Sequence, residues 1–196
     1  MTLDKPALRT AFAARRAALF AAQPLAGLTL AARLPRLDSP PGVVAGYWPM
    51  RSEIDPRPLM SRFARAGWRI ALPVTPSRRT ETGLLEFRLW TEGAALADHP
   101  FGMCEPQPDA EAVRPQIVLA PLLAFDAAGH RLGYGAGHYD RTLGRLRSEG
   151  VVCAVGLAFS GQEETTGLLP TGPHDQPLDA ILTEREVRII ERGQGF

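Results

Sequence analysis

Apolar side chains recur near helical spacing at the start of the chain, at Leu8, Ala11, Phe12, Ala18 and Leu19. Asp4 precedes this run as a candidate N-cap, and Pro6 is tolerated in the first turn of a helix. The pattern therefore predicts an amphipathic helix over residues 4–21.

Further along the chain, β-branched and apolar runs alternate with helical patterns. Strands are expected over residues 43–48, 69–72, 85–90, 117–120 and 151–157, and helices over 25–34, from Pro56 to Gly67 and from Tyr139 to Gly150. A polar loop is expected over 75–83 and a long connection over 98–115. Strands that alternate with helices indicate an α/β protein.

Length and charge limit the classes of protein to which this chain can belong. The 196 residues correspond to one domain of ordinary size, and 22 basic against 21 acidic side chains leave a net charge of +1. RNA binding through surface arginines is therefore disfavoured, as is attraction to an anionic membrane. The longest apolar run, from Ile117 to Phe125, is broken by Pro121, and two cysteines suit a reducing compartment. We expect a cytoplasmic protein.

The segment Arg131–Arg141 is the densest candidate for chemistry, because Gly133, Gly135 and Gly137 stand between a buried strand and a helix. Consecutive N–H groups in such a loop form an anion-binding concavity, so phosphate is the natural ligand. The loop is neither a Walker A motif nor a dinucleotide fingerprint, since no Gly-Lys pair occurs and His138 stands where the fingerprint needs glycine. A glycine-rich turn without a ligand remains the alternative.

Four charged side chains extend this candidate site. Asp140 and Asp175 can supply oxygen ligands to Mg²⁺, although Asp175 also suits an ordinary turn. Lys5 and Arg9 stand four residues apart on one helix face, where they either converge on a polyphosphate or form a solvated basic face.

Other conspicuous residues receive no chemical role from their pattern. We assign the side chains of Arg15, Arg16, Arg78 and Arg79 to solvent, and expect Trp48, Trp68 and Trp90 in the core or in a pocket wall. Ser160 does not lie in a Gly-x-Ser-x-Gly elbow, so serine hydrolase chemistry has no support.

Several spaced motifs resemble the 5-formyltetrahydrofolate cyclo-ligase family, also called methenyltetrahydrofolate synthetase. They are the runs Leu119–Asp126 and Arg131–Arg141, with Lys5–Arg9, Glu53 after Tyr47-Trp48, Ile70–Pro73, Phe101–Pro106, Gly156–Phe159 with Gln162, and Pro170 through His174-Asp175 to Asp179 and Thr183. These motifs extend over most of the chain in the family's order.

The resemblance implies an ATP-dependent ring closure of 5-formyltetrahydrofolate, with or without a polyglutamate tail, to 5,10-methenyltetrahydrofolate, with release of ADP and phosphate. It implies ATP contacts at Lys5, Arg9, Arg131, Leu132, Gly133, Tyr134, Gly135, Ala136, Gly137, His138 and Tyr139. It implies folate contacts at Trp48, Met50, Glu53 and the segment Tyr134–His138, Mg²⁺ ligation by Asp140 and Asp175, and catalytic roles for Lys5, Arg131 and Asp140.

We therefore expect one three-layer α/β domain over residues 1–196, with a mixed, mostly parallel sheet, acting as a monomer without nucleic acid or membrane. A non-catalytic nucleotide- or folate-binding paralogue is the alternative. Two positions depart from the family's usual pattern: His138 replaces an aromatic residue, most often tyrosine, and Ala136 replaces a glycine or arginine. Glycine is dispensable at position 136 if φ there is negative.

Overall fold

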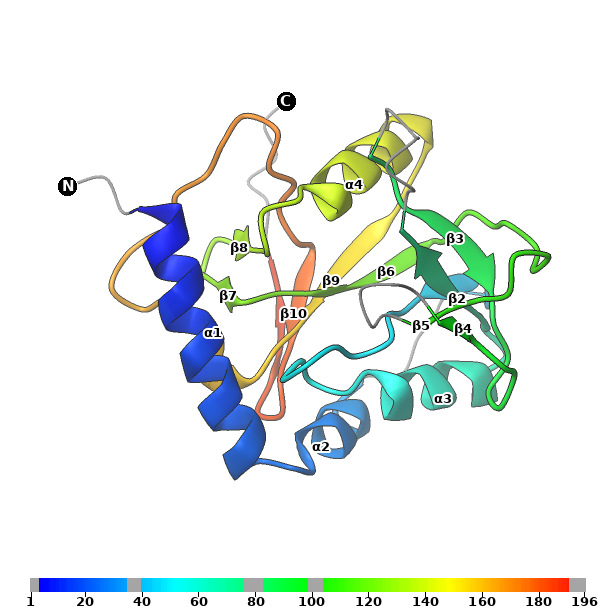
Figure 1. The fold of residues 1–196 in the computed structure, drawn as a ribbon, viewed down its shortest axis with the longest axis horizontal. Helices are drawn as coiled ribbons and strands as arrows, with labels where there is room; N and C mark the ends of the chain where they lie inside the picture. The colour runs from blue at the N-terminus through cyan, green and yellow to red at the C-terminus, as the bar shows by residue number, and fades with distance from the viewer. Residues whose placement is uncertain (1–3, 35–39, 76–82, 99–103, 191–196) are drawn as a thin grey trace.

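The structure, a computed structural model, describes residues 4–34, 40–75, 83–98 and 104–190. Its main sheet has seven strands in the order β11-β10-β9-β6-β1-β2-β3 (Figure 1). These strands are β1 (Val43–Ala45), β2 (Arg69–Val74), β3 (Glu86–Leu89), β6 (Ile117–Pro121), β9 (Cys153–Leu157), β10 (Ala180–Leu182) and β11 (Val187–Ile189). Neighbours from β2 to β10 run parallel, whereas β3 and β11 are antiparallel at the two edges.

Helices cover both faces of this sheet. On one face, α2 (Ala26–Ala32) and α3 (Arg57–Arg65) bury Leu30, Leu59 and Phe63 against the strands. On the other face, α4 (His138–Glu149) buries Leu143 and Leu146. The result is the expected three-layer α/β arrangement with a mixed, mostly parallel sheet, because each amphipathic helix removes its apolar stripe from water against a strand surface.

The N-terminal helix α1 (Lys5–Ala22) lies beside a small two-stranded sheet of β7 (Ala124–Phe125) and β8 (Arg131–Leu132) (Figure 1). Phe12 packs there against Leu123 and Leu132 in a buried cluster. The bounds of α1 confirm the predicted helix. The predicted apolar stripe was wrong at Ala11 and Ala18, because both residues are exposed. The predicted N-cap was also wrong in its contact, because the side chain of Asp4 makes no capping hydrogen bond.

The predicted helices and strands are all present within a few residues. The strand expected over 151–157 begins only at Cys153, and Val151 before it is 91 % exposed. The long connection over 98–115 contains a short strand, since β4 (Ala97–Asp98) pairs with β5 (Cys104–Glu105). The sequence patterns missed β7, β8, β10, β11 and the 3₁₀ turn η1 (Ser160–Gln162), all of which are two or three residues long. Most of the predicted polar loop, residues 76–82, lies outside the described residues.

No helix in the described ranges is long and apolar enough to cross a membrane.

Candidate active site

A pocket of about 380 Å³ opens at the carboxyl ends of β1, β2 and β6. Tyr47 and Met50 follow β1, Thr75 follows β2, and Pro121 ends β6. The chain passes from β1 to β2 on one side and returns to β6 on the other, so the pocket lies at the point where the strand order reverses. Ligands of open α/β sheets bind in this crevice.

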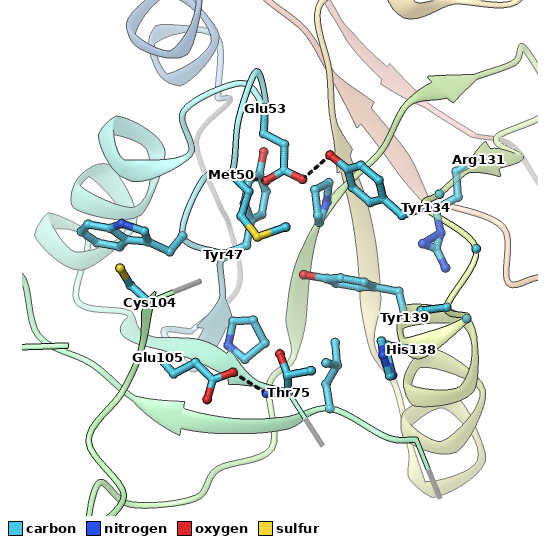
Figure 2. Close-up of a pocket in the computed structure, with 18 residues that line it drawn as sticks. Tyr47, Met50, Glu53, Thr75, Cys104, Glu105, Arg131, Tyr134, His138 and Tyr139 are labelled. Atoms are coloured by element: carbon cyan, nitrogen blue, oxygen red, sulfur yellow. Dashed lines mark hydrogen bonds between the residues drawn. The ribbon is translucent and has the colours of Figure 1, made fainter. Parts of the chain in front are cut away.

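The glycine loop between β8 and α4 forms one wall of the pocket, from Gly133 to Gly137 (Figure 2). Gly135 and Gly137 have φ values of 102° and 69°, which side chains rarely adopt. Ala136 has no positive φ, because Arg51 is the only non-glycine residue with one in the described chain. The absence of glycine at position 136 therefore does not distort the loop.

Helix α1 contacts this loop through Arg9. The Nε of Arg9 donates a hydrogen bond of 3.0 Å to the carbonyl oxygen of Gly133. A Cβ at Gly135 would lie 3.2 Å from Cζ of Arg9, so the missing side chain allows the guanidinium to approach the loop backbone. The basic face predicted for α1 therefore contacts the glycine loop through Arg9 and is not wholly solvated.

Two ion pairs stand next to the loop. Lys5 Nζ lies 3.0 Å from Oδ2 of Asp175, and Arg131 Nη2 lies 2.6 Å from Oδ1 of Asp140. The backbone N–H of Gln176 donates to the same Oδ1 of Asp140, which brings the two aspartates into one neighbourhood. Burial opposes ionisation of Asp175, but the N–H of Gly172 and the ammonium of Lys5 outweigh it, so the pKa of this carboxyl is lowered.

Arg131 lines the pocket with a side chain that is 5 % exposed. Its Nε is buried without a hydrogen-bond partner, and its guanidinium lies 5.6 Å from the ring centroid of Tyr139. A buried donor without a partner is costly. An anionic ligand in the pocket would supply the missing acceptor.

The donor set of the two aspartates suits Mg²⁺. In the described chain, the hydrogen bonds of each carboxylate reach only one of its oxygens, Oδ1 in Asp140 and Oδ2 in Asp175. The same ranges hold no cluster of three or more His, Cys, Asp or Glu side chains suited to a metal ion. Mg²⁺ commonly binds through one or two carboxylates together with phosphate oxygens and water, so a pair of aspartates beside a phosphate loop is a suitable set.

Glu53 forms the opposite, acidic end of the pocket, where its side chain is 4 % exposed. The hydroxyl of Tyr134 donates to Oε1 at 2.8 Å and the N–H of Met50 donates to Oε2 at 2.9 Å (Figure 2). Burial raises the pKa of Glu53, against the lowering effect of these hydrogen bonds. Burial and the Glu53 charge raise the pKa of Tyr134 to about 12, so this hydroxyl keeps its proton.

Arg16 corrects our assignment of four arginines to solvent. Its side chain is 3 % exposed, and its Nη1 lies 3.9 Å from Oε1 of Glu53. Arg15 is exposed as expected, while Arg78 and Arg79 lie outside the described residues. The assignment failed because Arg16 occupies the inward face of α1, a face that apolar spacing alone did not define.

His138 begins α4 and lines the pocket, and its Nδ1 lies 2.8 Å from the carbonyl oxygen of Gly83. A carbonyl only accepts, so Nδ1 carries the proton of this hydrogen bond. Arg141 Nη2 is 3.5 Å from the same ring nitrogen and also reaches the Gly83 carbonyl. The imidazole is therefore anchored at the pocket edge with Nε2 as its second polar atom.

The remaining candidates divide between pocket and core. Trp48 and Met50 line the pocket, whereas Trp68 is buried in the core and Trp90 packs edge to face on Trp48 at 5.7 Å. Leu132 also belongs to the core, so only its backbone is available to a ligand. The sequence pattern gave no role to further lining residues, namely Tyr47, Pro73, Thr75, Leu85, Cys104, Glu105 and Pro121.

Glu105 is the most polar of these missed residues, and it accepts a hydrogen bond of 2.8 Å from the N–H of Thr75 (Figure 2). The sequence did contain a signal for Glu105, namely the family motif in which it lies. Glu105 lies in the run Phe101–Pro106 and Pro73 in the run Ile70–Pro73, two motifs that carry the family resemblance without a function attached to them.

The fold and the site together define a three-layer α/β protein with a glycine loop of the anion-binding type beside an acidic pocket. The chain belongs to the 5-formyltetrahydrofolate cyclo-ligase family, which matches residues 1–184.

Characterised relatives and solved structures agree with this membership. The chain is 34 % identical over 149 residues to 5-formyltetrahydrofolate cyclo-ligase of Mycolicibacterium smegmatis, covering 72 % of this chain and 73 % of the relative. It is 34 % identical over 148 residues to the Escherichia coli K12 enzyme of the same name, covering 74 % and 79 %. The NMR structure of Aquifex aeolicus 5,10-methenyltetrahydrofolate synthetase superposes with a TM-score of 0.73 at 28 % identity, covering 98 % and 95 %.

Proposed function

We propose that this protein catalyses the ATP- and Mg²⁺-dependent cyclisation of 5-formyltetrahydrofolate to 5,10-methenyltetrahydrofolate, with release of ADP and phosphate. The observation that carries the proposal is the glycine loop, which is bonded to Arg9 on one side and lines, with Arg131, the pocket that also holds Glu53. The glycine loop and Arg131 at one end, and Glu53 at the other, thus belong to one cavity. Family membership supports the same activity.

In this proposal the triphosphate of ATP occupies the glycine loop. The N-terminus of α4 and the loop N–H groups provide a positive concavity for phosphate. Lys5 and Arg131 exchange part of their pairing with Asp175 and Asp140 for phosphate oxygens. Arg9 braces the loop through its bond to Gly133, and Leu132 to Tyr139 complete the nucleotide-binding segment.

Asp140 and Asp175 would hold Mg²⁺ together with the phosphates. The ion neutralises charge on the phosphates and orients the transferred group. The ion pairs described above hold both carboxylates in place, which makes them ready ligands.

The reduced pterin of the substrate is placed at the acidic end. Its ring N–H and amino groups are donors, and Glu53 supplies a fixed carboxylate to accept them, while Trp48 and Met50 offer apolar contact. The Tyr134–His138 backbone contacts the substrate from the opposite wall. This placement directs the formyl group toward the phosphate end.

ATP is needed because the oxygen of a formamide is a poor leaving group. The γ-phosphoryl group moves to the formyl oxygen, breaking its bond to ADP, and nitrogen-10 then attacks the formyl carbon. The carbon–oxygen bond breaks, phosphate leaves with that oxygen, and nitrogen-10 loses its proton. Lys5 and Arg131 stabilise the charge on the phosphoryl group, and a closed pocket keeps water from the activated carbon.

An absorbance assay tests the proposal directly. The protein is mixed with Mg-ATP and 5-formyltetrahydrofolate, and formation of the methenyl chromophore is followed, with parallel reactions lacking ATP or protein. We expect ATP-dependent formation of the chromophore. A protein that binds ATP and folate without turnover would instead be a non-catalytic paralogue.

We further propose that residues 1–196 form one domain that acts as a cytoplasmic monomer and takes folates with or without a polyglutamate tail. Support for one domain comes from the site itself, which joins Lys5 of α1 to Asp175 near the other end of the chain. The chain has only two cysteines, Cys104 and Cys153, which suits a reducing compartment.

A further inference from the structure

We infer that Arg16 is a positioning residue for the folate pocket, which orients Glu53 and Tyr134 and provides the counter-charge for the Glu53 carboxylate. The inference deepens the proposed function and rests on it, since it concerns the pocket assigned to the pterin. Arg16 itself is not among the residues that line the pocket, so it acts through the two side chains that are.

The geometry shows how one guanidinium serves both partners. Arg16 Nη1 lies 3.9 Å from Oε1 of Glu53, the same oxygen that accepts the Tyr134 hydroxyl bond. Its Cζ lies 5.4 Å from the centroid of the Tyr134 ring, a distance at which a cation is attracted to an aromatic face. Arg16 therefore contacts both ends of the Tyr134–Glu53 hydrogen bond.

Two further contacts fix the guanidinium. Arg16 Nε donates to Oγ of Ser52 at 3.2 Å, and Nη1 donates to the carbonyl oxygen of Leu122 at 3.4 Å. Ser52 directly precedes Glu53, so Arg16 holds the turn that presents the carboxylate as well as the carboxylate itself. A long side chain with this many partners is held in one rotamer, which makes it suitable for positioning.

Arg16 also links the two ends of the site through α1. Lys5, Arg9 and Arg16 fall within an arc of about 40° on the helix, given 3.6 residues per turn. Lys5 and Arg9 contact Asp175 and the glycine loop, while Arg16 contacts Glu53. One rigid helix thus sets the phosphate end and the folate end relative to each other.

The charge of Arg16 is important because Glu53 is buried. Burial favours the protonated acid, and the cation opposes it, as do Arg51 and the hydrogen bonds from Met50 and Tyr134. Tyr47 and Tyr139 also face Glu53, but burial holds the pKa of both phenols above the usual value, so they stay neutral. A protonated Glu53 would lose its capacity to accept donors from the pterin on both oxygens.

The test compares Arg16→Met, Arg16→Lys and, as a matched control, Arg15→Met, which removes the neighbouring but exposed arginine of the same helix. For each purified protein, the KM values for 5-formyltetrahydrofolate and for ATP are measured, with kcat/KM for folate as a function of pH. Circular dichroism and thermal melts confirm that each variant is folded.

In Arg16→Met we expect KM for 5-formyltetrahydrofolate to rise about tenfold or more, because a buried charge partner is lost, while KM for ATP changes by less than about twofold. The acidic limb of the folate profile should move to higher pH by about half a unit or more, because removal of the cation raises the pKa of Glu53 further. Arg16→Lys should leave the acidic limb of the kcat/KM profile near its original pH and give a KM for 5-formyltetrahydrofolate between those of the parent and Arg16→Met. Arg15→Met should have the KM values and the pH profile of the parent.

The inference is overturned if folded Arg16→Met retains the parent's folate KM and pH profile, or if Arg16→Lys and Arg16→Met lose activity equally with an unmoved limb. The second result would describe a packing role alone. If Arg16→Met does not fold, Arg16→Gln replaces it, since glutamine keeps hydrogen-bonding capacity without charge. A parent protein that forms no methenyl product would refute the proposed function itself, which separates the two failures.

Discussion

Arg131 and Asp140 form the shortest cation–carboxylate contact at the phosphate end of the pocket, with 2.6 Å between Nη2 and Oδ1. The arginine is nearly buried, while the aspartate is 26 % exposed and also accepts the N–H of Gln176. In the proposed function, Asp140 therefore holds the phosphate-binding Arg131 in position and keeps a second oxygen for a metal ion.

This arrangement predicts a selective defect in Asp140→Asn. The amide oxygen can still accept from Arg131 and Gln176, but the negative charge for Mg²⁺ is lost. We expect kcat to fall by about 100-fold, within the range for loss of electrostatic stabilisation, with a melting temperature lower by only a few degrees, about 2–4 °C per kcal/mol at this size. A variant that unfolds while its folded fraction retains parental kcat would show Asp140 to be structural.

Turnover should require a divalent cation. Phosphate charges beside two carboxylates repel each other unless a cation lies between them. Activity in the methenyl assay should disappear in excess EDTA and return on addition of Mg²⁺ in excess of the chelator. Unchanged turnover in EDTA would argue that Asp140 and Asp175 serve only their ion pairs with Arg131 and Lys5.

Lys5→Met should weaken ATP binding while leaving folate binding intact. The ammonium forms a charge-assisted contact worth on the order of 1.5 to 3 kcal/mol, and Lys5→Arg should restore only part of it because a planar guanidinium has a different reach. Titration of ATP in the assay measures the effect. Identical ATP dependence in Lys5→Met and the parent would exclude the N-terminal helix from the nucleotide site.

Gly135→Ala should impair the loop more than Gly133→Ala does. Gly135 has a φ of 102° and stands against Arg9, whereas Gly133 has no positive φ and open space where a Cβ would be. The strain of an alanine at such an angle costs about 1–3 kcal/mol. KM for ATP in the two variants measures the difference, and equal values would show that the backbone angle at Gly135 is irrelevant to the nucleotide.

His138→Tyr should change the KM for 5-formyltetrahydrofolate more than kcat. His138 lines the pocket and its Nδ1 is bonded to the carbonyl oxygen of Gly83, so Nε2 is the ring nitrogen left for a ligand. A tyrosine keeps an aromatic face but lacks this nitrogen. Both kinetic constants are measured in the parent and in His138→Tyr, and equal KM values would reduce His138 to a pocket-edge residue without contact to substrate.

The local sequence contained enough information for the main elements and for the glycine loop. Apolar spacing identified α1, α3 and α4 as helices, because a helix that buries one face must repeat its apolar residues every three or four positions, although it did not give the whole inward face of α1. The order of strand, glycines and helix around Gly133–Gly137 predicted a loop of the anion-binding type by the same local reasoning. The short strands β7, β8, β10 and β11 were not predicted, because two or three residues are too few to show a period in hydrophobicity.

Only the tertiary structure decided which charged side chains contact one another. Lys5 and Asp175 are 170 positions apart, and no spacing rule connects them. Arg15 and Arg16 are adjacent and chemically identical, yet one is exposed and the other is enclosed with Glu53 and Tyr134. A charged side chain is buried only where the fold brings it a partner that compensates for lost hydration, and that partner is chosen by the packing of distant segments rather than by the neighbouring sequence.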